Sequence, residues 1–357
     1  MSPREGRAPL TVVQWTTGNV GRQAVAGVAD DPGLRYVGCY AHSADKVGRD
    51  LGELAGIGAL GVKATDDSAA LLALKPDVVV YTPLHLDVDE LAGILSAGIN
   101  VVTSAEFLTG SAIGAEARAR LEAAAQQGGV TLFGSGMNPG FAQLIAGVLS
   151  GICRRIKRVR VTESFDLSLF ADDPNMDELP FGMPGDAPDL LERMRSSTAV
   201  FMDAVDVLAD LLGVSLDEHR CTADFATATE DLDLPGRPIA AGQVAGIDLR
   251  WDGIMGGEPV VELHQRWVMG DRIEPPMPPE SAYLIEIDGQ PKVSARIDLL
   301  PHHEDLSLLT MDDLHEIGMR ITAMPLVYAI PAACAAAPGI TTYAGLPAVV
   351  SGRVHAH

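Results

Sequence analysis

The sequence predicts an α/β protein with two parts: an N-terminal domain built on a parallel sheet, and a C-terminal α+β domain with a mixed, largely antiparallel sheet. Three observations predict this. Residues 1–150 alternate short β-rich runs with helical runs, the pattern of parallel strands joined by crossover helices. After Gly140 helical runs become rarer and alternating, strand-like runs take over. The length of 357 residues also exceeds what one hydrophobic core usually needs.

The composition indicates a globular protein whose partners are neither nucleic acids nor membranes. Apolar residues make up 47% of the chain and charged residues 21%, which is typical of a protein with a full hydrophobic core. The sequence has 26 Lys and Arg residues against 48 Asp and Glu residues, a formal net charge of −22. Because so acidic a surface repels phosphate groups, we expect no binding to nucleic acid or to anionic membranes.

Cysteine spacing and the N-terminal residues predict a cytoplasmic protein without a metal site. The four cysteines are scattered, with no Cys-x-x-Cys pair and no histidine at ligand spacing, so we expect reduced thiols rather than a disulfide framework or a zinc site. Residues 1–7 lack the apolar stretch of a signal peptide. Residues 321–352 carry no charge, but four prolines interrupt them. This predicts a buried helical segment in pieces too short to span a membrane.

In the N-terminal domain, strands and helices are separated by turn residues. The expected strands cover residues 10–15, 35–41, 62–64, 77–81, 100–103 and 131–134. Each is a short β-rich run, and Asp77 is followed by Val-Val-Val-Tyr, as in a strand covered on both faces. The expected helices cover residues 21–29, 87–97 and 115–127, with one more from the acidic cap Asp66-Asp67 to Leu74. Glycine and proline turns end them.

The C-terminal domain is expected to cover residues 141–311, while residues 1–140 form the N-terminal domain and the segment from about 312 to 357 packs back on it. Helices are expected at 141–152 and 199–212, and a loop at 171–189. Alternating runs predict strands at 158–163, 247–251, 260–269, 283–287 and 293–299, the last two joined in a hairpin across Asp288-Gly289. Such a sheet leaves an open face with apolar alternation, so we expect a homodimer partner to cover it.

The turn after the first strand carries a pattern for binding a dinucleotide. Thr16-Thr17-Gly18-Asn19-Val20-Gly21 matches G-x-G-x-x-G with Thr16 in place of the first glycine. Gly18 lets the backbone approach a pyrophosphate, Gly21 lets helix and strand pack closely, and the N–H groups at the helix start bind the anion. The alternative is a merely tight turn. Its position between the first strand and the first helix favours a Rossmann domain that binds a nicotinamide dinucleotide.

The end of the second strand bears on the choice between NAD and NADP. An acidic residue there would bind the ribose 2′-hydroxyl and repel a 2′-phosphate, and no acid stands directly at this strand end. His42, Ser43 and Lys46 can donate hydrogen bonds to a phosphate, which favours NADP. Asp45 leaves NAD open, and Lys46 is alternatively a solvated loop residue.

Polar residues also follow two later strands. Thr82-Pro83 and Ser104-Ala105-Glu106 stand at carboxyl ends of strands, where open α/β sheets bind ligands. We expect Glu106 to lie beside the nicotinamide, where desolvation by Phe107 suits a carboxyl group for proton transfer near neutral pH. Taken alone, a helix-capping glutamate in a solvated loop explains Glu106 equally well.

Residues near the domain junction are candidates for binding cofactor and substrate. Asn138 precedes Pro139 as in a helix N-cap, and it lies where substrate and nicotinamide are expected to meet. Phe141, Phe165 and Met176 are candidate wall residues of the substrate pocket, although filling the core is the commoner fate of such side chains.

Two histidine-containing segments have less specific interpretations. Glu262 and His264 alternate on one expected strand, where they line a pocket or face the solvent. His302-His303 resembles a metal or acid–base cluster in the bare sequence. Because adjacent residues of a strand point to opposite faces, we expect no metal there.

Several motifs together resemble the 2,4-diaminopentanoate dehydrogenases and the related native amine dehydrogenases. They are Thr-Gly-Asn-Val-Gly-Arg at 17–22, Lys-Val-Gly-Arg-Asp-Leu at 46–51, Gly-Val-Lys-Ala-Thr-Asp-Asp at 61–67, Asn-Pro-Gly-Phe at 138–141 and Ala-Ile-Pro-Ala-Ala-Cys-Ala-Ala at 329–336. The resemblance spans essentially the whole chain. It implies a dihydrodipicolinate-reductase-like N-terminal domain, a homodimer, and NAD(P)H-dependent reductive amination of an aldehyde or ketone with ammonia, with the reverse deamination of an amine. It also implies that Glu106 is the catalytic residue.

The sequence departs from related patterns at two points and leaves two other functions open. Thr16 replaces a glycine, and residues 302–303 are followed by Glu-Asp-Leu-Ser-Leu-Leu instead of the Lys-x-Asp-Ala-Pro-Ser-Gly-Thr of dihydrodipicolinate reductases, which disfavours that reaction. One alternative is an oxidoreductase of a diamino or amino-keto acid, whose carboxylate Arg158, Arg160 and Arg266 are candidates to bind. The other is a non-catalytic NAD(P)-binding regulator, for which Glu106 would be expendable.

Overall fold

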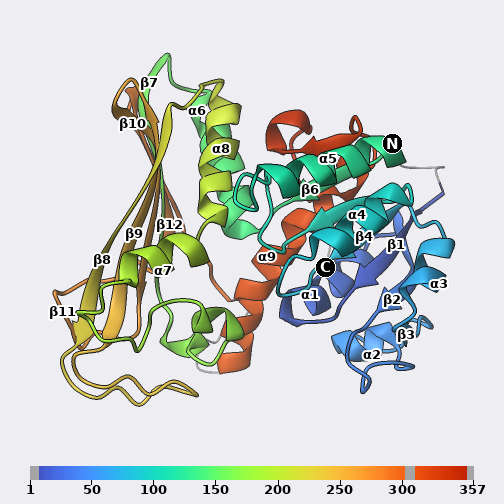
Figure 1. The fold of residues 1–357 in the computed structure, drawn as a ribbon, viewed down its shortest axis with the longest axis horizontal. Helices are drawn as coiled ribbons and strands as arrows, with labels where there is room; N and C mark the ends of the chain where they lie inside the picture. The colour runs from blue at the N-terminus through green and yellow to red at the C-terminus, as the bar shows by residue number, and fades with distance from the viewer. Residues whose placement is uncertain (1–7, 302–309, 352–357) are drawn as a thin grey trace. The chain divides into compact units, whose positions relative to one another are not determined.

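The computed structural model describes residues 8–301 and 310–351, which group into two compact units. The first unit comprises Met1–Phe141 together with Gly318–His357, and the second comprises Ala142–Ile317. Each unit contains one seven-stranded sheet (Figure 1). The predicted fold class, a Rossmann domain followed by an α+β domain with a mixed sheet, is confirmed.

The sheet of the first unit is parallel throughout, with the strand order β14-β6-β5-β4-β1-β2-β3. Its strands are β1 (Leu10–Trp15), β2 (Leu34–Tyr40), β3 (Ala64–Thr65), β4 (Val78–Tyr81), β5 (Asn100–Thr103), β6 (Thr131–Gly134) and β14 (Gly339–Thr341). The order reverses between β1 and β4, which makes the carboxyl ends of these two strands the switch point where open α/β sheets bind ligands.

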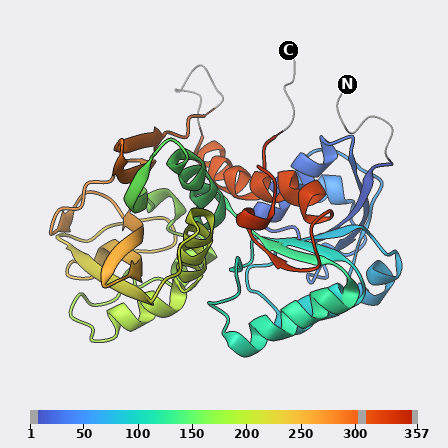
Figure 2. The same ribbon diagram turned by 90° about the horizontal axis from the view of Figure 1, so that it is seen from above.

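Helices cover both faces of this sheet (Figure 2). They are α1 (Asn19–Ala29), α2 (Leu51–Ala55), α3 (Ser68–Ala73), α4 (Val88–Ser96), α5 (Ala115–Gly128) and the first-unit part of α9 (Met311–Ala333). Acidic caps begin three of them: the carboxylates of Asp50, Asp67 and Asp87 accept hydrogen bonds from the first N–H groups of α2, α3 and α4. The predicted helix ends at Gly98 and Gly129 lie within two residues of the observed ones.

The uncharged C-terminal segment differs from its prediction. Helix α9 runs through Pro325 and Pro331 instead of breaking there, and Ala323, Leu326 and Ile330 are fully buried. Beyond the helix the chain forms strand β14, which pairs with β6 and extends the sheet at its edge (Figure 2), and then a 3₁₀ turn at Tyr343–Gly345. In the part of the chain that the structure describes, no helix is long and apolar enough to cross a membrane.

The second unit has a mixed sheet of order β11-β8-β9-β10-β7-β12-β13, in which β7 and β10 are parallel and the other pairs antiparallel. The strands are β7 (Arg155–Asp166), β8 (Glu218–Ala228), β9 (Val244–Met255), β10 (Glu258–Val268), β11 (Ile273–Glu274), β12 (Ala282–Gln290) and β13 (Val293–Ile297). The hairpin is real, but β12 extends past Asp288-Gly289. The sequence analysis does not predict strand β8. In the structure, exposed and half-buried residues alternate along the first eight residues of this strand.

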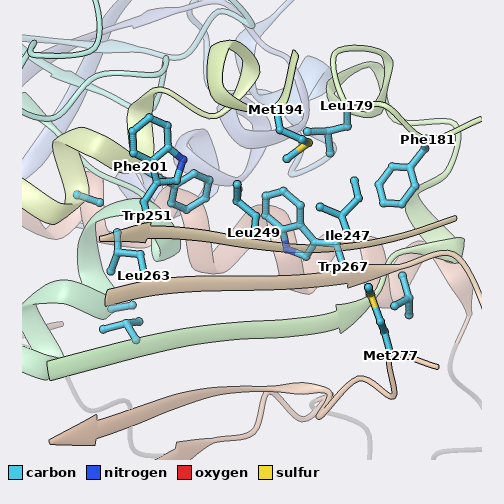
Figure 3. Close-up of a cluster of buried hydrophobic side chains, with 14 of the residues drawn as sticks. Leu179, Phe181, Met194, Phe201, Ile247, Leu249, Trp251, Leu263, Trp267 and Met277 are labelled. Carbon is cyan, nitrogen blue, oxygen red and sulfur yellow. The ribbon is translucent and has the colours of Figure 1, made fainter. Parts of the chain in front are cut away.

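Three helices cover one face of this sheet: α6 (Ala142–Ser150), α7 (Leu190–Ser197), which the sequence did not predict, and α8 (Val200–Leu212) (Figure 1). Between β7 and α7 the chain forms a 3₁₀ turn at Ser168–Phe170 and, inside the predicted loop at 171–189, a second one at Pro174–Asp177. Beneath the helices lies the core of the unit, where Trp251, Leu263 and Trp267 project from the strands toward Phe201 and Met194 (Figure 3). Val159 and Val161 of β7, Ile247 and Leu249 of β9 and Val261 of β10 are fully buried in this core.

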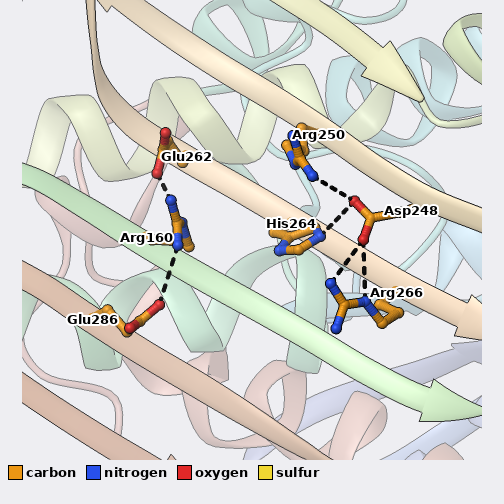
Figure 4. Close-up of polar contacts among 7 residues, drawn as sticks. All are labelled: Arg160, Asp248, Arg250, Glu262, His264, Arg266 and Glu286. Carbon is orange, nitrogen blue, oxygen red and sulfur yellow. Dashed lines mark hydrogen bonds and ion pairs between the residues drawn. The ribbon is translucent and has the colours of Figure 1, made fainter. Parts of the chain in front are cut away.

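The opposite face is charged, so the prediction of an open face with apolar alternation is wrong. Even-numbered residues point to it and pair across strands (Figure 4). Arg160 Nε lies 2.8 Å from Glu262 Oε2, and Asp248 lies 2.7 Å from His264 Nε2 and 2.9 Å from Arg266 Nη2. Burial acts to raise the pKa of Asp248, but hydrogen bonds from His264 and Arg266 and nearby positive charge outweigh it and lower the pKa to about 2. The apolar members of each alternation lie beneath the helices instead.

The packing of α1 against the switch point predicts that substitution of Gly21 costs more stability than substitution of Gly18. A Cβ atom on Gly21 would lie 2.6 Å from the Thr16 carbonyl oxygen and 2.8 Å from Thr82 Oγ1, whereas one on Gly18 would meet nothing within 4 Å. We expect Gly21→Ala to lower the free energy of unfolding by about 1–3 kcal/mol through overpacking. The matched control Gly18→Ala should lose less than about 1 kcal/mol. Urea denaturation followed by tryptophan fluorescence measures both, and equal losses would contradict this packing.

Candidate active site

The predicted site residues of the first unit gather at one edge of its sheet. Because β1, β2, β4, β5 and β6 are all parallel, the segments that follow them emerge at the same edge. These segments carry the predicted cofactor residues, which are Thr16, Thr17, Gly18, Asn19, Val20, Gly21, His42, Ser43, Lys46, Thr82, Pro83, Ser104 and Asn138. Glu106 follows β5 at this edge as well.

The turn after β1 has an unusual backbone at Thr16. This residue adopts a φ of +73°, a left-handed conformation that a β-branched side chain rarely takes and that the first glycine of the dinucleotide pattern would adopt freely. The fully buried Gln14 holds the turn, because its Nε2 donates to the Thr16 carbonyl at 2.9 Å and to Thr82 Oγ1 at 2.9 Å. The hydroxyl of Tyr36 donates to Gln14 Oε1 at 3.0 Å. Neither Gln14 nor Tyr36 was singled out in the sequence, although a glutamine inside an apolar strand is a visible signal.

The start of α1 fits the pyrophosphate of a dinucleotide. Gly18 is the N-cap of this helix, it is exposed, and no side chain caps the first N–H groups, so they are available to an anion. Around Gly18 there is room for a ligand to reach the backbone. The buried hydroxyls of Thr16 and Thr17 have no hydrogen-bond partner, and buried polar groups in proteins normally have one. These observations fit a phosphate-bearing ligand bound at the turn.

Thr82 has a structural role in the turn, beside the cofactor contact that the sequence predicts. Its hydroxyl contacts Gln14 Nε2 and lies 3.3 Å from the carbonyl oxygen of Trp15, so its side chain stabilises the turn. Pro83 lines a groove of about 830 Å³ together with His42, His85 and Arg120. The groove starts where the predicted adenosine end of the cofactor would lie, next to the ends of β2 and β4.

The end of β2 is built around stacked rings. Tyr40 stacks on Trp15 at a centroid distance of 4.3 Å, and His42 meets Tyr40 edge-on at 4.8 Å. Lys46 is half-buried, and its Nζ donates to the Thr17 carbonyl at 3.3 Å. The interpretation of Lys46 as a freely solvated loop residue is therefore wrong, because the ammonium group is held at the dinucleotide turn. Ser43 and Asp45 are exposed.

Glu106 is held in a strained turn directly after β5. Its φ is +45°, which costs free energy in a non-glycine residue and is found mostly at functional sites. Its N–H donates to the Ser104 carbonyl at 3.0 Å, and the Ala105 N–H donates to Thr103 Oγ1 at 3.0 Å. Ala105 and Phe107 on either side are buried, while Glu106 is exposed.

The position of Phe107 corrects one expectation. This ring packs into the hydrophobic core between the sheet, α4 and α5, and its carbonyl comes so close to β6 that a Cβ on Gly134 would lie 1.7 Å away. Phe107 therefore anchors the turn from below and does not desolvate the Glu106 carboxylate. What it supplies is a fixed position for Glu106 at the edge of the sheet.

The loop after β6 also differs from its prediction. Asn138 has an extended backbone, a cis peptide joins it to Pro139, and α6 begins only at Ala142, so Asn138 is not an N-cap. Tyr343 fixes the start of this loop, because its hydroxyl lies 2.6 Å from Ser135 Oγ and its ring meets Phe133 edge-on at 5.1 Å. No local signal connects Tyr343 to a loop more than 200 residues earlier.

The three predicted substrate-pocket residues divide between the units. Phe141 belongs to the first unit and packs edge-on against Tyr343 at 6.3 Å. Phe165 and Met176 belong to the second unit, where Phe165 meets Tyr283 edge-on at 5.2 Å and Met176 packs against the core. Their shared pocket stays a prediction.

The arginines considered as a carboxylate clamp lie on the charged face of the second unit. Arg158 and Arg160 pair with Glu262, and Arg266 pairs with Asp248. His264 likewise pairs with Asp248. Arg266 and Asp248 also line a hollow of about 380 Å³ beside Phe225 and Met277. Within residues 8–301 and 310–351, no cluster of His, Cys, Asp and Glu can hold a metal ion. His302-His303 lies outside the described residues.

The sequence and the fold of this chain match those of known proteins. The model of the family "Dihydrodipicolinate reductase, N-terminus" matches residues 12–134. A 4-hydroxy-tetrahydrodipicolinate reductase from Synechococcus elongatus is 33% identical over 97 residues, which cover 26% of this chain and 36% of that protein. The structure of GenD2 from gentamicin A biosynthesis, at 16% identity and a TM-score of 0.51 over 90% of this chain and 95% of that chain, shares the fold.

Two relatives match nearly the whole chain. The structure of an amine dehydrogenase from Mycobacterium smegmatis has 25% identity and a TM-score of 0.77, covering 96% of this chain and 98% of that chain. An amine dehydrogenase from Streptomyces virginiae is 34% identical over 315 residues, which cover 84% of this chain and 87% of that protein. The resemblance that the sequence motifs indicate is thereby confirmed. The chain is an NAD(P)-dependent oxidoreductase that belongs to the amine dehydrogenase family.

Proposed function

We propose that the protein catalyses the reductive amination of an aldehyde or ketone with ammonia, and the reverse deamination of an amine, with Glu106 as its catalytic residue. The observation that carries this proposal is the backbone of Glu106, a strained left-handed residue fixed between buried neighbours. It stands at the sheet edge that also carries the dinucleotide turn. When bound there, the nicotinamide supplies or accepts the hydride.

Glu106 has to move protons between the steps of this reaction. Ammonia is mostly ammonium at neutral pH, so a base must take its proton before it attacks the carbonyl carbon. The hydroxyl of the resulting carbinolamine then needs an acid in order to leave as water. One carboxyl group can serve as base and then as acid. Its charged form also stabilises the iminium cation that the loss of water creates.

The charged face of the second unit weakens the main alternative. An oxidoreductase of a diamino or amino-keto acid would need a basic residue for the substrate carboxylate. The candidate arginines of the sequence instead neutralise Glu262 and Asp248 within the sheet. The strained backbone of Glu106 at the sheet edge favours a catalytic role over a non-catalytic regulator, because such strain clusters at active sites.

We further propose that the cofactor is NADP rather than NAD, and that the protein acts in the cytoplasm. Lys46 supports NADP, because its ammonium group lies against the turn that would hold the pyrophosphate, and no acid replaces it at the end of β2. The four cysteines are free thiols, as in a reducing compartment.

Replacing Glu106 tests the catalytic proposal. The isosteric variant Glu106→Gln cannot exchange protons, so the single-turnover rate of amination should fall by about 10²–10⁴, the range for a lost general acid–base group. Cofactor affinity should stay within a few-fold. Glu53→Gln, an exposed glutamate of α2, is the matched control. A panel of ketones, aldehydes and amines followed at the nicotinamide absorbance supplies the substrate, and near-normal turnover of Glu106→Gln would exclude Glu106 from the mechanism.

The cofactor preference is tested by reversing the charge of Lys46. Titration of wild-type protein should show tighter binding of NADP than of NAD. Lys46→Glu should shift the preference toward NAD by about 1–3 kcal/mol, the worth of a hydrogen bond to a charged group. The exposed Lys63 gives the control Lys63→Glu with the same change in net charge. Tighter binding of NAD by the wild type would overturn the assignment.

The oligomeric state is tested by mass. We propose a homodimer joined through the charged face of the second sheet, where rows of paired Arg, Glu and Asp side chains are complementary to a second copy of themselves. Light scattering at micromolar concentration should give twice the 37.5 kDa of one chain. Because the face is charged, high salt should weaken the association. A mass of 37.5 kDa at low salt would contradict the dimer.

A further inference from the structure

The loop after β6 is closed at its base by one carbonyl group. The Gly136 carbonyl accepts a hydrogen bond from the Ser135 hydroxyl at 3.2 Å and another from the Phe141 N–H at 2.9 Å. The chain between them turns back so tightly that a Cβ atom on Gly140 would lie 2.6 Å from Ser135 Oγ. The path of this loop, which carries the half-buried Asn138, therefore depends on where the Ser135 side chain is held.

Ser135 also connects this loop to the turn of Glu106. The backbone N–H of Ser135 donates to the Thr103 carbonyl at the end of β5, at 2.9 Å. The Thr103 hydroxyl in turn accepts the hydrogen bond of the Ala105 N–H at 3.0 Å, and Ala105 directly precedes Glu106. Ser135 is thus bonded to both segments, to one through its side chain and to the other through its backbone.

Tyr343 holds the Ser135 side chain in place. The two hydroxyl oxygens lie 2.6 Å apart, and both side chains are buried. Burial raises the pKa of Tyr343, so its hydroxyl keeps its proton and donates it to Ser135 Oγ. The Ser135 proton is then left for the Gly136 carbonyl. A buried chain of hydrogen bonds therefore runs from the C-terminal segment into the loop after β6.

The position of Tyr343 is itself fixed by its surroundings. Strand β14, which ends shortly before Tyr343, pairs with β6. The Tyr343 ring lies edge-on to Phe133 at 5.1 Å and to Phe141 at 6.3 Å. A phenylalanine would fill the same space between these rings, so the contribution of the hydroxyl is its hydrogen bond to Ser135 and not packing.

We propose that Tyr343 is a positioning residue for the amination, because through Ser135 it keeps the Asn138 loop and the Glu106 turn at a constant separation during the reaction. All four residues belong to the first unit. The inference rests on the proposed function and adds a residue of the C-terminal segment to those on which its rate depends. Reaction rates are sensitive to such positioning, since a displacement of about 1 Å can cost about 10² in rate.

Two substitutions remove this hydrogen bond and leave the rings in place: Tyr343→Phe and Ser135→Ala. Each should lower kcat for amination by about 10- to 100-fold, while the Kd of the cofactor stays within a few-fold because the dinucleotide turn is unchanged. The double variant should be at most about twofold slower than the slower single variant, because both substitutions break the same chain of contacts. The half-buried Tyr328 of α9 gives the matched control Tyr328→Phe, which should keep a normal kcat.

Hydrogen exchange in the cofactor-free protein adds a readout that does not depend on turnover. The Phe141 amide, which donates to the Gly136 carbonyl, should exchange about five- to tenfold faster in Tyr343→Phe and in Ser135→Ala than in the wild type, the factor that one hydrogen bond supplies. Its exchange in Tyr328→Phe should not change.

The outcomes separate this inference from the proposed function. A normal kcat in Tyr343→Phe, or unchanged exchange of the Phe141 amide, would overturn the inference alone. If Tyr343→Phe does not fold, the same two measurements on Ser135→Ala decide the matter. Wild-type protein that aminates no ketone or aldehyde would overturn the proposed function, and this inference with it.

Discussion

The hydrogen bonds of one buried amide hold the dinucleotide turn together. Gln14 lies on β1, and its side chain reaches the Thr16 carbonyl, the hydroxyl of Thr82 after β4 and the hydroxyl of Tyr36 on β2. It therefore ties three strands together at the point where the strand order reverses. The left-handed backbone of Thr16 is tolerated because these contacts define its carbonyl. The start of α1 has free N–H groups for a ligand. The turn before it is rigid because Gln14, whose side chain makes all three of these hydrogen bonds, holds it in place.

The local signals of the sequence account for most of the first unit. Apolar runs bounded by turns predict β1 to β6, and acidic residues before helical runs predict the caps at Asp67 and Asp87, because both signals act over a few residues. Strand β14 has only three residues, and its place beside β6 depends on a pairing more than 200 residues apart. The path of α9 through two prolines likewise results from burial, which outweighs a local preference against helix.

The position of the candidate residues follows from the strand ends. Parallel strands deliver the residues after β1, β4 and β5 to one edge, so the sequence alone predicts that Gly18, Pro83 and Glu106 share this edge. The fixed turn of Glu106, with Phe107 beneath it, could not be foreseen because it depends on close contact with Gly134 of another strand. The charged face of the second sheet has another cause. Alternation in a sequence shows that the two faces of a strand differ, but it does not show which face the helices cover.

The discontinuity of the first unit has a consequence for how the chain is made. The second unit is one continuous segment, Ala142–Ile317, whereas the first unit needs Gly318–His357 to complete its sheet and bury α1 against Met324. A ribosome releases the chain from its N-terminus, so the second unit is fully synthesised while the edge of β6 still lacks β14. An unpaired β6 edge offers open N–H and C=O groups to other chains. The order of synthesis therefore makes the pairing of β14 with β6 a late step in folding, and the edge of β6 stays open until that step.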